Sequence, residues 1–545
     1  MTGVYTDNQP DFTWLQPFEE KSFKQYFMPY KNIGIVKNAT IDAAVNLEVD
    51  PQTKLVTVKV YATSKLEGAE IKLSSKNRSY IMETTALSPG KTFIAIVPLH
   101  PDDEEHDLRL TVKDASGRLL VGYQPKKAQI EDIPEAAKLL PEPKDLKTNE
   151  QLYLAGLHLE QYRHATIEPE AYYLEGLKRD DSDIRINVAY GTLMLRRGLF
   201  AKSEKHFRNA IGSLTWRNPN PYDSEAYYQL GVSLKQQGRL DEAFAAFYKA
   251  VWSAAWQDSG YFSLAQIAAE KGAFEEALEL VDRSLIRNSR HYKARDLRTA
   301  LLRRLGRLDE AKAAAMETIG LDIADFGAYY ELHLYYEAAG ETADAKRALQ
   351  EITELMRKDP HNHIALAADY AGSGLYEEAI QSLRIIAPND ESDTYPMVHY
   401  ALSFCYSHSG RTDLAAKHLL AGEKSAPDYC FPNTLFDLTV LEYIVEQDPD
   451  AARARYFLGN FYYDKKRSDD AVAQWETSAK LDAAYSVTHR NLALAYYNKN
   501  NEPEKARDSL EAAFACDKKD ARIFYELDQL YKKIQLTPEE RLALL

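Results

Sequence analysis

A glycine recurs every 34 residues through the middle of the chain, and this period constrains the fold more than any other feature. The glycines are Gly238, Gly272, Gly306, Gly340 and Gly374, and an alanine follows each of them five residues later. Glycine fills only 24 of the 545 positions, so a series this regular does not arise by chance. A fixed period of about 20 to 50 residues is typical of solenoids, in which similar units stack on one another.

Each unit is predicted to be a pair of short helices joined at the recurring glycine. In residues 227–251, Gly231 leaves room for the second helix to approach the first, and Ala243, Phe247 and Ala250 share one face of that second helix. This pattern resembles the tetratricopeptide repeat (TPR), and the resemblance covers residues 150–545. It implies an all-α superhelix with a concave groove that binds a protein or peptide.

The array is expected to hold about ten helix pairs between residues 150 and 545. The spacing from Ala415 to Ala471 exceeds one period, which leaves room for an extra helix near residues 434–446. Residues 521–534 are expected to close the array, because a solenoid needs a last helix to cover its final apolar face.

Residues 38–125 show a different pattern, in which apolar and polar residues alternate. Val45, Leu47 and Val49 begin this alternation, and about seven short segments of the same kind follow one another before Pro125. Such spacing predicts an immunoglobulin-like or fibronectin-like β-sandwich. Residues 126–149 are rich in proline and charge and are expected to form a linker. The predicted fold class is therefore α+β and multidomain, with a β-sandwich followed by a TPR solenoid.

Residues 1–37 are rich in aromatic residues and are predicted to form an extended β segment. Together with residues 38–49 they resemble a junction in uncharacterised bacterial proteins that join a galactose-mutarotase-like β-supersandwich, a small β-sandwich and a TPR array. The resemblance implies that residues 1–37 are the tail of a missing supersandwich domain, which is suspected to handle carbohydrate. Asp7, Gln9, Asp11 and Trp14 would then be remnants of a sugar-facing strand, and the alternative is that they are turn and packing residues.

Aromatic residues recur at two positions of the repeat units. Those at the eleventh position are expected in the core: Tyr336, Tyr370, Tyr406, Tyr462 and Tyr496. Those at the fifth position are expected to line the concave groove, where they would be partly exposed: Tyr228, Phe262, Tyr330, Tyr400 and Tyr456. Tyr463 and Tyr497 complete the candidate binding set. The alternative is that the fifth-position rings pack between adjacent helices.

Composition and motifs exclude several classes of function. A formal net charge of -15 disfavours nucleic acid as a partner, since such binding needs clustered lysine and arginine. The sequence has no long apolar run and no signal peptide, so no membrane partner and a cytoplasmic location are expected. Three scattered cysteines suit neither a disulfide framework nor a metal site, and we expect no cofactor.

Motifs for hydrolases, phosphate binding and dinucleotide binding are missing from the sequence, so the chain itself is expected not to be an enzyme. The favoured hypothesis is a non-catalytic scaffold that binds a protein or peptide in the groove. The alternative is the C-terminal portion of a carbohydrate-binding or carbohydrate-active bacterial protein.

Overall fold

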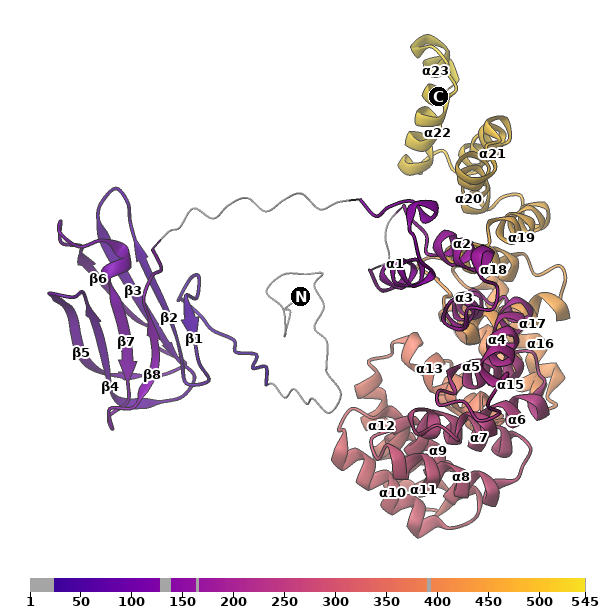
Figure 1. Cartoon of the computed structure of the whole chain (residues 1–545), viewed down its shortest axis with the longest axis horizontal. Helices are drawn as coiled ribbons and strands as arrows, with labels where there is room; N and C mark the ends of the chain where they lie inside the picture. The colour runs from indigo at the N-terminus through magenta and orange to yellow at the C-terminus, as the bar shows by residue number, and fades with distance from the viewer. Residues whose placement is uncertain (1–23, 128–138, 163–165, 390–393, 545) are drawn as a thin grey trace. The chain divides into compact units, whose positions relative to one another are not determined.

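The computed structural model describes residues 24–127, 139–162, 166–389 and 394–544 (Figure 1). The chain divides into two compact units, with the boundary between Leu139 and Leu140. The first unit holds the β-strands, and the second holds the α-helices.

The first unit is built from two four-stranded antiparallel sheets. One sheet has the order β1-β2-β3-β6 and the other β5-β4-β7-β8. The strands are β1 (Asn38–Ala39), β2 (Ala43–Val49), β3 (Leu55–Ala62), β4 (Leu66–Ser74), β5 (Ser79–Leu87), β6 (Phe93–Pro98), β7 (Arg109–Lys113) and β8 (Leu119–Tyr123). Apart from the short β1, the division into β2-β3-β6 and β5-β4-β7-β8 is that of a fibronectin-like sandwich.

Alternation of side chains explains why these segments form a sandwich. In β2 and β3, Val45 lies opposite Val60 and Leu47 opposite Val58, and all four side chains are buried. Because successive side chains of a strand point to opposite faces, one face of each sheet becomes apolar and packs on the other sheet. The shared core joins residues of both sheets, so the predicted β-sandwich is confirmed.

Residues 24–37, the described part of the segment predicted as β structure, contain no strand. They lie on the outer face of the β2-β3 sheet, where Ile33 is buried against Ala44 and Tyr61. The Asn46 side-chain amide donates a 2.8 Å hydrogen bond to the Ile33 carbonyl. This segment therefore covers part of the sheet without extending it.

The second unit is a chain of antiparallel helix pairs, as the 34-residue period predicts. Its first half comprises α1 (Asn149–Tyr162), α2 (Glu170–Arg179), α3 (Ile184–Arg196), α4 (Phe200–Thr215), α5 (Glu225–Gln236), α6 (Leu240–Ala250), α7 (Gln257–Glu270), α8 (Phe274–Arg287), α9 (Tyr292–Arg304), α10 (Leu308–Leu321), α11 (Phe326–Ala338) and α12 (Thr342–Met356). Its second half comprises α13 (Pro360–Ala371), α14 (Tyr376–Arg384), α15 (Pro396–His408), α16 (Thr412–Lys424), α17 (Leu435–Gln447), α18 (Ala452–Asp464), α19 (Ser468–Leu481), α20 (Ser486–Ala495), α21 (Pro503–Cys516), α22 (Ala521–Lys533) and α23 (Pro538–Leu544).

Two kinds of glycine shape each helix pair. The recurring glycines of the period, such as Gly238, have φ near 70–76° and form the turn between the two helices, a conformation that favours glycine. Gly231 acts differently, because a Cβ atom there would lie 2.6 Å from the ring of Phe247. The missing side chain lets α5 and α6 approach closely enough to bury Phe247.

The stack of helix pairs is interrupted after α12, although the sequence period continues through this point. Arg357 and Lys358 both adopt left-handed backbone conformations, with φ of 53° and 55°, and Asp359 then caps α13. Arg357 is the C-cap residue of α12, and the C-cap residues of α8 and α10, Asn288 and Asp322, have φ of -138° and -143° instead. As a result α12 packs along α11 but makes very few contacts with α13.

Because of this interruption, α13 and α14 turn into the concave side of the preceding repeats. Lys235 at the end of α5 donates a 2.9 Å hydrogen bond to the carbonyl of Gly372, and the Tyr330 hydroxyl of α11 donates one of the same length to the carbonyl of Glu378. The side chain of Lys293 on α9 forms a 2.6 Å ion pair with Asp369. The middle of the predicted groove is thus filled by the chain itself. We call this packing of α13 and α14 on the inner face of the preceding repeats the fold-back.

The second half of the array also meets the first half near α4. A guanidinium nitrogen of Arg467 lies 3.3 Å from the carbonyl oxygen of Arg197, and Leu438 of α17 packs on Gly198. In Figure 1 the orange helices α15–α18 accordingly lie beside the magenta helices α3–α5. We call the part of the array in which these later helices pack on the earlier ones the closed region.

Candidate functional site

Three of the aromatic residues predicted to line the groove are core residues. Tyr330, Tyr400 and Tyr456 are only 1%, 0% and 7% exposed, so the prediction of partly exposed rings is wrong for them. The fold-back explains why Tyr330 is buried, because its hydroxyl donates a hydrogen bond to the carbonyl of Glu378 on α14. Tyr400 donates a 2.7 Å hydrogen bond to Glu423, and the Tyr456 ring packs edge-on against Tyr485. These rings pack between helices, which is the alternative interpretation of the pattern.

The other four candidates are half-buried and pack on neighbouring side chains. Tyr228 stacks on Trp256 at 4.8 Å between ring centroids, and Phe262 meets the ring of His291 at 4.7 Å. Tyr463 packs against Trp475, and the Lys533 ammonium lies 4.9 Å from the Tyr497 ring centroid. Each retains some exposed surface, so a binding role for these four stays a prediction.

The remaining sequence candidates divide into two groups. Of the eleventh-position tyrosines, Tyr370, Tyr406, Tyr462 and Tyr496 are buried as predicted, whereas Tyr336 is only half-buried. The residues proposed as a sugar-facing remnant lie outside the described residues: Asp7, Gln9, Asp11 and Trp14.

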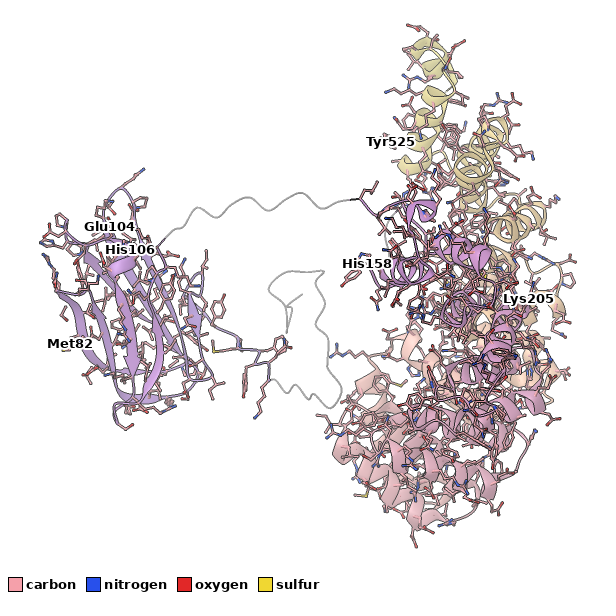
Figure 2. All side chains as sticks on the ribbon, viewed as in Figure 1. Met82, Glu104, His106, His158, Lys205 and Tyr525 are labelled. Atoms are coloured by element: carbon pink, nitrogen blue, oxygen red, sulfur yellow. The ribbon has the colours of Figure 1, made fainter. Side chains whose placement is uncertain are left out.

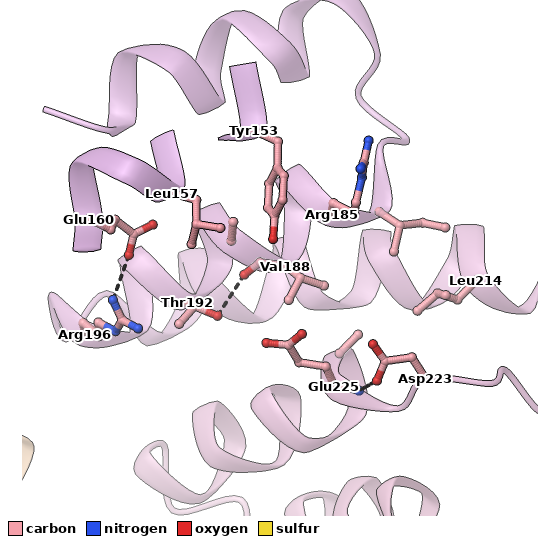
Figure 3. Close-up of a pocket in the computed structure, with 13 residues that line it drawn as sticks. Tyr153, Leu157, Glu160, Arg185, Val188, Thr192, Arg196, Leu214, Asp223 and Glu225 are labelled. Atoms are coloured by element: carbon pink, nitrogen blue, oxygen red, sulfur yellow. Dashed lines mark hydrogen bonds and ion pairs between the residues drawn. The ribbon is translucent and has the colours of Figure 1, made fainter. Parts of the chain in front are cut away.

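An open cavity of about 360 Å³ lies on the concave side at the N-terminal end of the array (Figure 3). Helices α1 and α3 form its walls, and the end of α4 and the start of α5 close it. The lining residues are Tyr153, Leu157, Glu160, Ile184, Arg185, Val188, Ala189, Thr192, Arg196, Leu214, Asp223, Glu225 and Ala226. We call this cavity the N-terminal groove.

The sequence does indicate an aromatic residue at this site, but in a divergent unit outside the five regular repeats. Tyr153 lies three residues before Gly156, just as Tyr228 lies three residues before Gly231. Both glycines sit against the aromatic ring of the partner helix, so Tyr153 occupies the fifth position of the divergent first unit. It lines the groove as the fifth-position hypothesis requires.

The cationic wall of the N-terminal groove is already paired. The Arg185 guanidinium lies 5.3 Å from the Tyr153 ring centroid and 3.5 Å from a carboxylate oxygen of Glu150. Arg196 forms a 2.7 Å ion pair with Glu160, which also accepts a hydrogen bond from the hydroxyl of Tyr173. Both arginines are therefore held in place by acidic partners.

Two polar groups that face the groove lack a hydrogen-bond or ion-pair partner among the described residues. Among the described residues, no hydrogen bond or ion pair reaches the Glu225 carboxylate, and none reaches the Tyr153 hydroxyl. Burial raises the pKa of Glu225, and the nearby charge of Asp223 adds to that effect. Burial likewise raises the pKa of Tyr153, and the charge of Glu225 contributes. Figure 3 shows both groups directed into the same cavity from opposite sides.

The chemistry available elsewhere in the described part of the chain is limited. No group of three or more histidine, cysteine, aspartate or glutamate side chains there is arranged to hold a metal ion. Burial raises the pKa of Cys405 and of Cys430 to about 12, so neither thiol is a ready nucleophile. Within the same residues, no helix combines the length and apolar character needed to span a bilayer.

Two family models match segments of the chain. A model described as "YphG-like protein, second domain" matches residues 38–123, which are the strands of the β-sandwich. A tetratricopeptide repeat model matches residues 189–260 and 438–486. The helical array contains TPR repeats. The first matched range includes Thr192 and Glu225, so part of the lining of the N-terminal groove belongs to repeats of this kind, whereas Tyr153 on α1 lies outside the matched range.

Solved structures with similar helical arrays are distant. A tetratricopeptide repeat protein from Parabacteroides merdae ATCC 43184 is 14% identical, with a TM-score of 0.31, over 58% of this chain and 99% of that chain. A structure of Naa15/Naa10 bound to HypK-THB is 14% identical, with a TM-score of 0.27, over 73% of this chain and 67% of that chain. The TPR domain of P58(IPK) is 16% identical, with a TM-score of 0.18, over 65% of this chain and 100% of that chain.

Proposed function

We propose that this protein is a non-catalytic scaffold that binds a protein or peptide partner in the N-terminal groove. The main support for this proposal is a difference between the middle and the N-terminal end of the inner face of the TPR array. In the middle, α13 and α14 fill the groove and pair its polar groups. At the N-terminal end the cavity stays open, and the Tyr153 hydroxyl and the Glu225 carboxylate point into it with no hydrogen-bond or ion-pair partner among the described residues.

A polypeptide segment suits this cavity in size and in chemistry. Ligand pockets commonly have volumes of about 300 to 1,000 Å³, so a cavity at the lower end accommodates one or two side chains rather than a folded domain. Its floor is apolar, through Leu157, Val188 and Leu214, while its rim is charged. A partner that inserts side chains and runs along α1 and α3 would bury the floor and reach the rim.

The proposal includes the cytoplasmic location and the exclusion of nucleic acid, which a net charge of -15 supports. Carbohydrate binding is less well supported. Nothing among the described residues favours a sugar site, and the match at residues 38–123 concerns the β-sandwich rather than a mutarotase-like domain.

Peptide display on the full chain tests this proposal. A random dodecamer library is selected on the wild-type protein, and the recovered peptides are measured on Thr192→Trp, which places an indole in the cavity. Lys205→Trp adds the same side chain on the exposed surface of α4 and serves as the matched control (Figure 2). We expect affinity to fall about tenfold or more on Thr192→Trp, which corresponds to about 1.4 kcal/mol, and to be retained on Lys205→Trp. Equal binding to both variants would refute the proposal.

A further inference from the structure

The chemistry of the N-terminal groove also constrains which partner segment it selects. Glu225 begins α5, and its side chain is partly withdrawn from water. A carboxylate in such a place is unfavourable unless a cation or hydrogen-bond donors compensate for its lost hydration. In the described part of the chain no side chain does so.

The two arginines that line the groove each form an ion pair with another acidic residue. Arg185 pairs with Glu150 and lies over the Tyr153 ring, and Arg196 pairs with Glu160. The remaining charged group at this side is Asp223, whose carboxylate accepts hydrogen bonds from the Trp256 indole and the backbone N–H of Glu225. The open side of the groove is therefore acidic, and no side chain in the described part of the chain supplies a counter-ion to it.

We infer that the N-terminal groove selects a partner segment carrying a lysine or arginine side chain, which forms an ion pair with Glu225. This inference rests on the proposed function and adds the chemical class of the partner. Charge complementarity carries it, since a cationic side chain supplies the counter-ion that no described residue provides for Glu225. The Tyr153 hydroxyl, directed into the same cavity, accepts a further hydrogen bond from the ammonium or guanidinium group. An acidic segment would instead meet the repulsion of Glu225 and Asp223.

The apolar floor explains how such a side chain would enter. Lysine and arginine carry aliphatic stems of about three or four methylene groups, which pack on apolar surface while the charged head stays at a polar site. Val188 and Leu157 provide that surface. One cationic side chain therefore matches both the floor and the acidic side of the cavity.

The display experiment separates this inference from the proposed function. Peptides whose binding depends on Thr192 are sequenced, and enrichment of lysine and arginine over aspartate and glutamate is measured. The selected peptides are then titrated against Glu225→Gln and against Glu276→Gln, the same charge change on the exposed surface of α8. We expect Glu225→Gln to weaken binding about tenfold or more and Glu276→Gln to have little effect. Glu225→Lys should restore binding of peptides whose key lysine is replaced by glutamate.

The outcomes are distinct for the two claims. If groove-dependent peptides show no cationic enrichment, or bind Glu225→Gln as well as wild type, the inference is wrong and the scaffold proposal stands. If no selected peptide depends on Thr192, both claims fail together. Thermal unfolding of Glu225→Gln provides a further control. Among the described residues the carboxylate has no hydrogen-bond or ion-pair partner, so a loss of binding with an unchanged midpoint assigns the effect to the ion pair with the peptide.

Discussion

Asp296 makes the interior of the closed region sensitive to pH. Its carboxyl group lies on α9, packed against Gly327, and one of its oxygens has no hydrogen-bond partner in the described residues. Burial raises the pKa of Asp296 well above its usual value, and the charge of Asp325 and a shared hydrogen bond raise it further. Asp296 therefore holds its proton in the folded state at pH values where the unfolded chain has released it.

This difference fixes the direction of the pH effect. Between the unfolded pKa near 4 and the raised folded pKa, the folded state binds one more proton than the unfolded state. The free energy of unfolding thus falls by about 1.4 kcal/mol for each pH unit as pH rises. The amide of the Asp296→Asn variant would keep a donor toward Asp325 but would not titrate. The stability of Asp296→Asn relative to wild type should therefore rise by about 1 to 3 kcal/mol between pH 5 and pH 7.

Urea unfolding followed by circular dichroism at pH 5, 6 and 7 measures this quantity, because the helical signal reports mainly on the TPR array. Asp309→Asn, on the exposed face of α10, is the matched control and should keep the wild-type dependence on pH. If Asp296→Asn shows the same pH dependence as Asp309→Asn, Asp296 does not retain a proton in the folded state, and the account of this buried pair is refuted.

Two further predictions concern helix packing and the fold-back. Gly231→Ala should lower the free energy of unfolding by about 1 to 3 kcal/mol, since the added Cβ overlaps the Phe247 ring. The control is Gly212→Ala on α4, where the added Cβ meets open space and should not destabilise the protein. The midpoints of urea unfolding of the two variants test this prediction. Glu378→Gln should weaken the packing of α14 on the preceding repeats, because Glu378 forms ion pairs with Arg303 at 2.9 Å and Arg304 at 2.6 Å. We expect the free energy of unfolding to fall by about 2 to 4 kcal/mol and amide hydrogen exchange in α13 and α14 to become faster. Exchange that stays at the wild-type rate there would mean that this bridge does not hold the fold-back.

Local patterns were sufficient to predict the fold class. The alternation in β2 and β3 produces one apolar face by geometry alone, and the recurring glycines place the turn of each helix pair. These features depend on residues close together in the sequence. They were therefore readable without knowing which elements pack together.

The 34-residue period of the sequence does not predict the fold-back. Gly340 and Gly374 keep the 34-residue spacing across it, so the sequence predicts continued stacking. The change of direction after α12 depends on left-handed backbone conformations at Arg357 and Lys358. Neither arginine nor lysine favours that conformation. A second signal was present but ambiguous: α9 ends with the charged residues Arg303 and Arg304, and their partner Glu378 lies in a later unit.

Paired and unpaired polar groups distinguish a closed interface from a binding surface in this array. In the closed region, burial alone would raise the pKa of Glu378, yet Arg304 and Arg303 hold it below its usual value. In the N-terminal groove burial raises the pKa of Glu225, and no cationic side chain of the described residues opposes that shift. The same carboxyl chemistry is thus satisfied internally at one place and left incomplete at the other. An external cation completes the second site as the two arginines complete the first, which is why the partner of the N-terminal groove is expected to be basic.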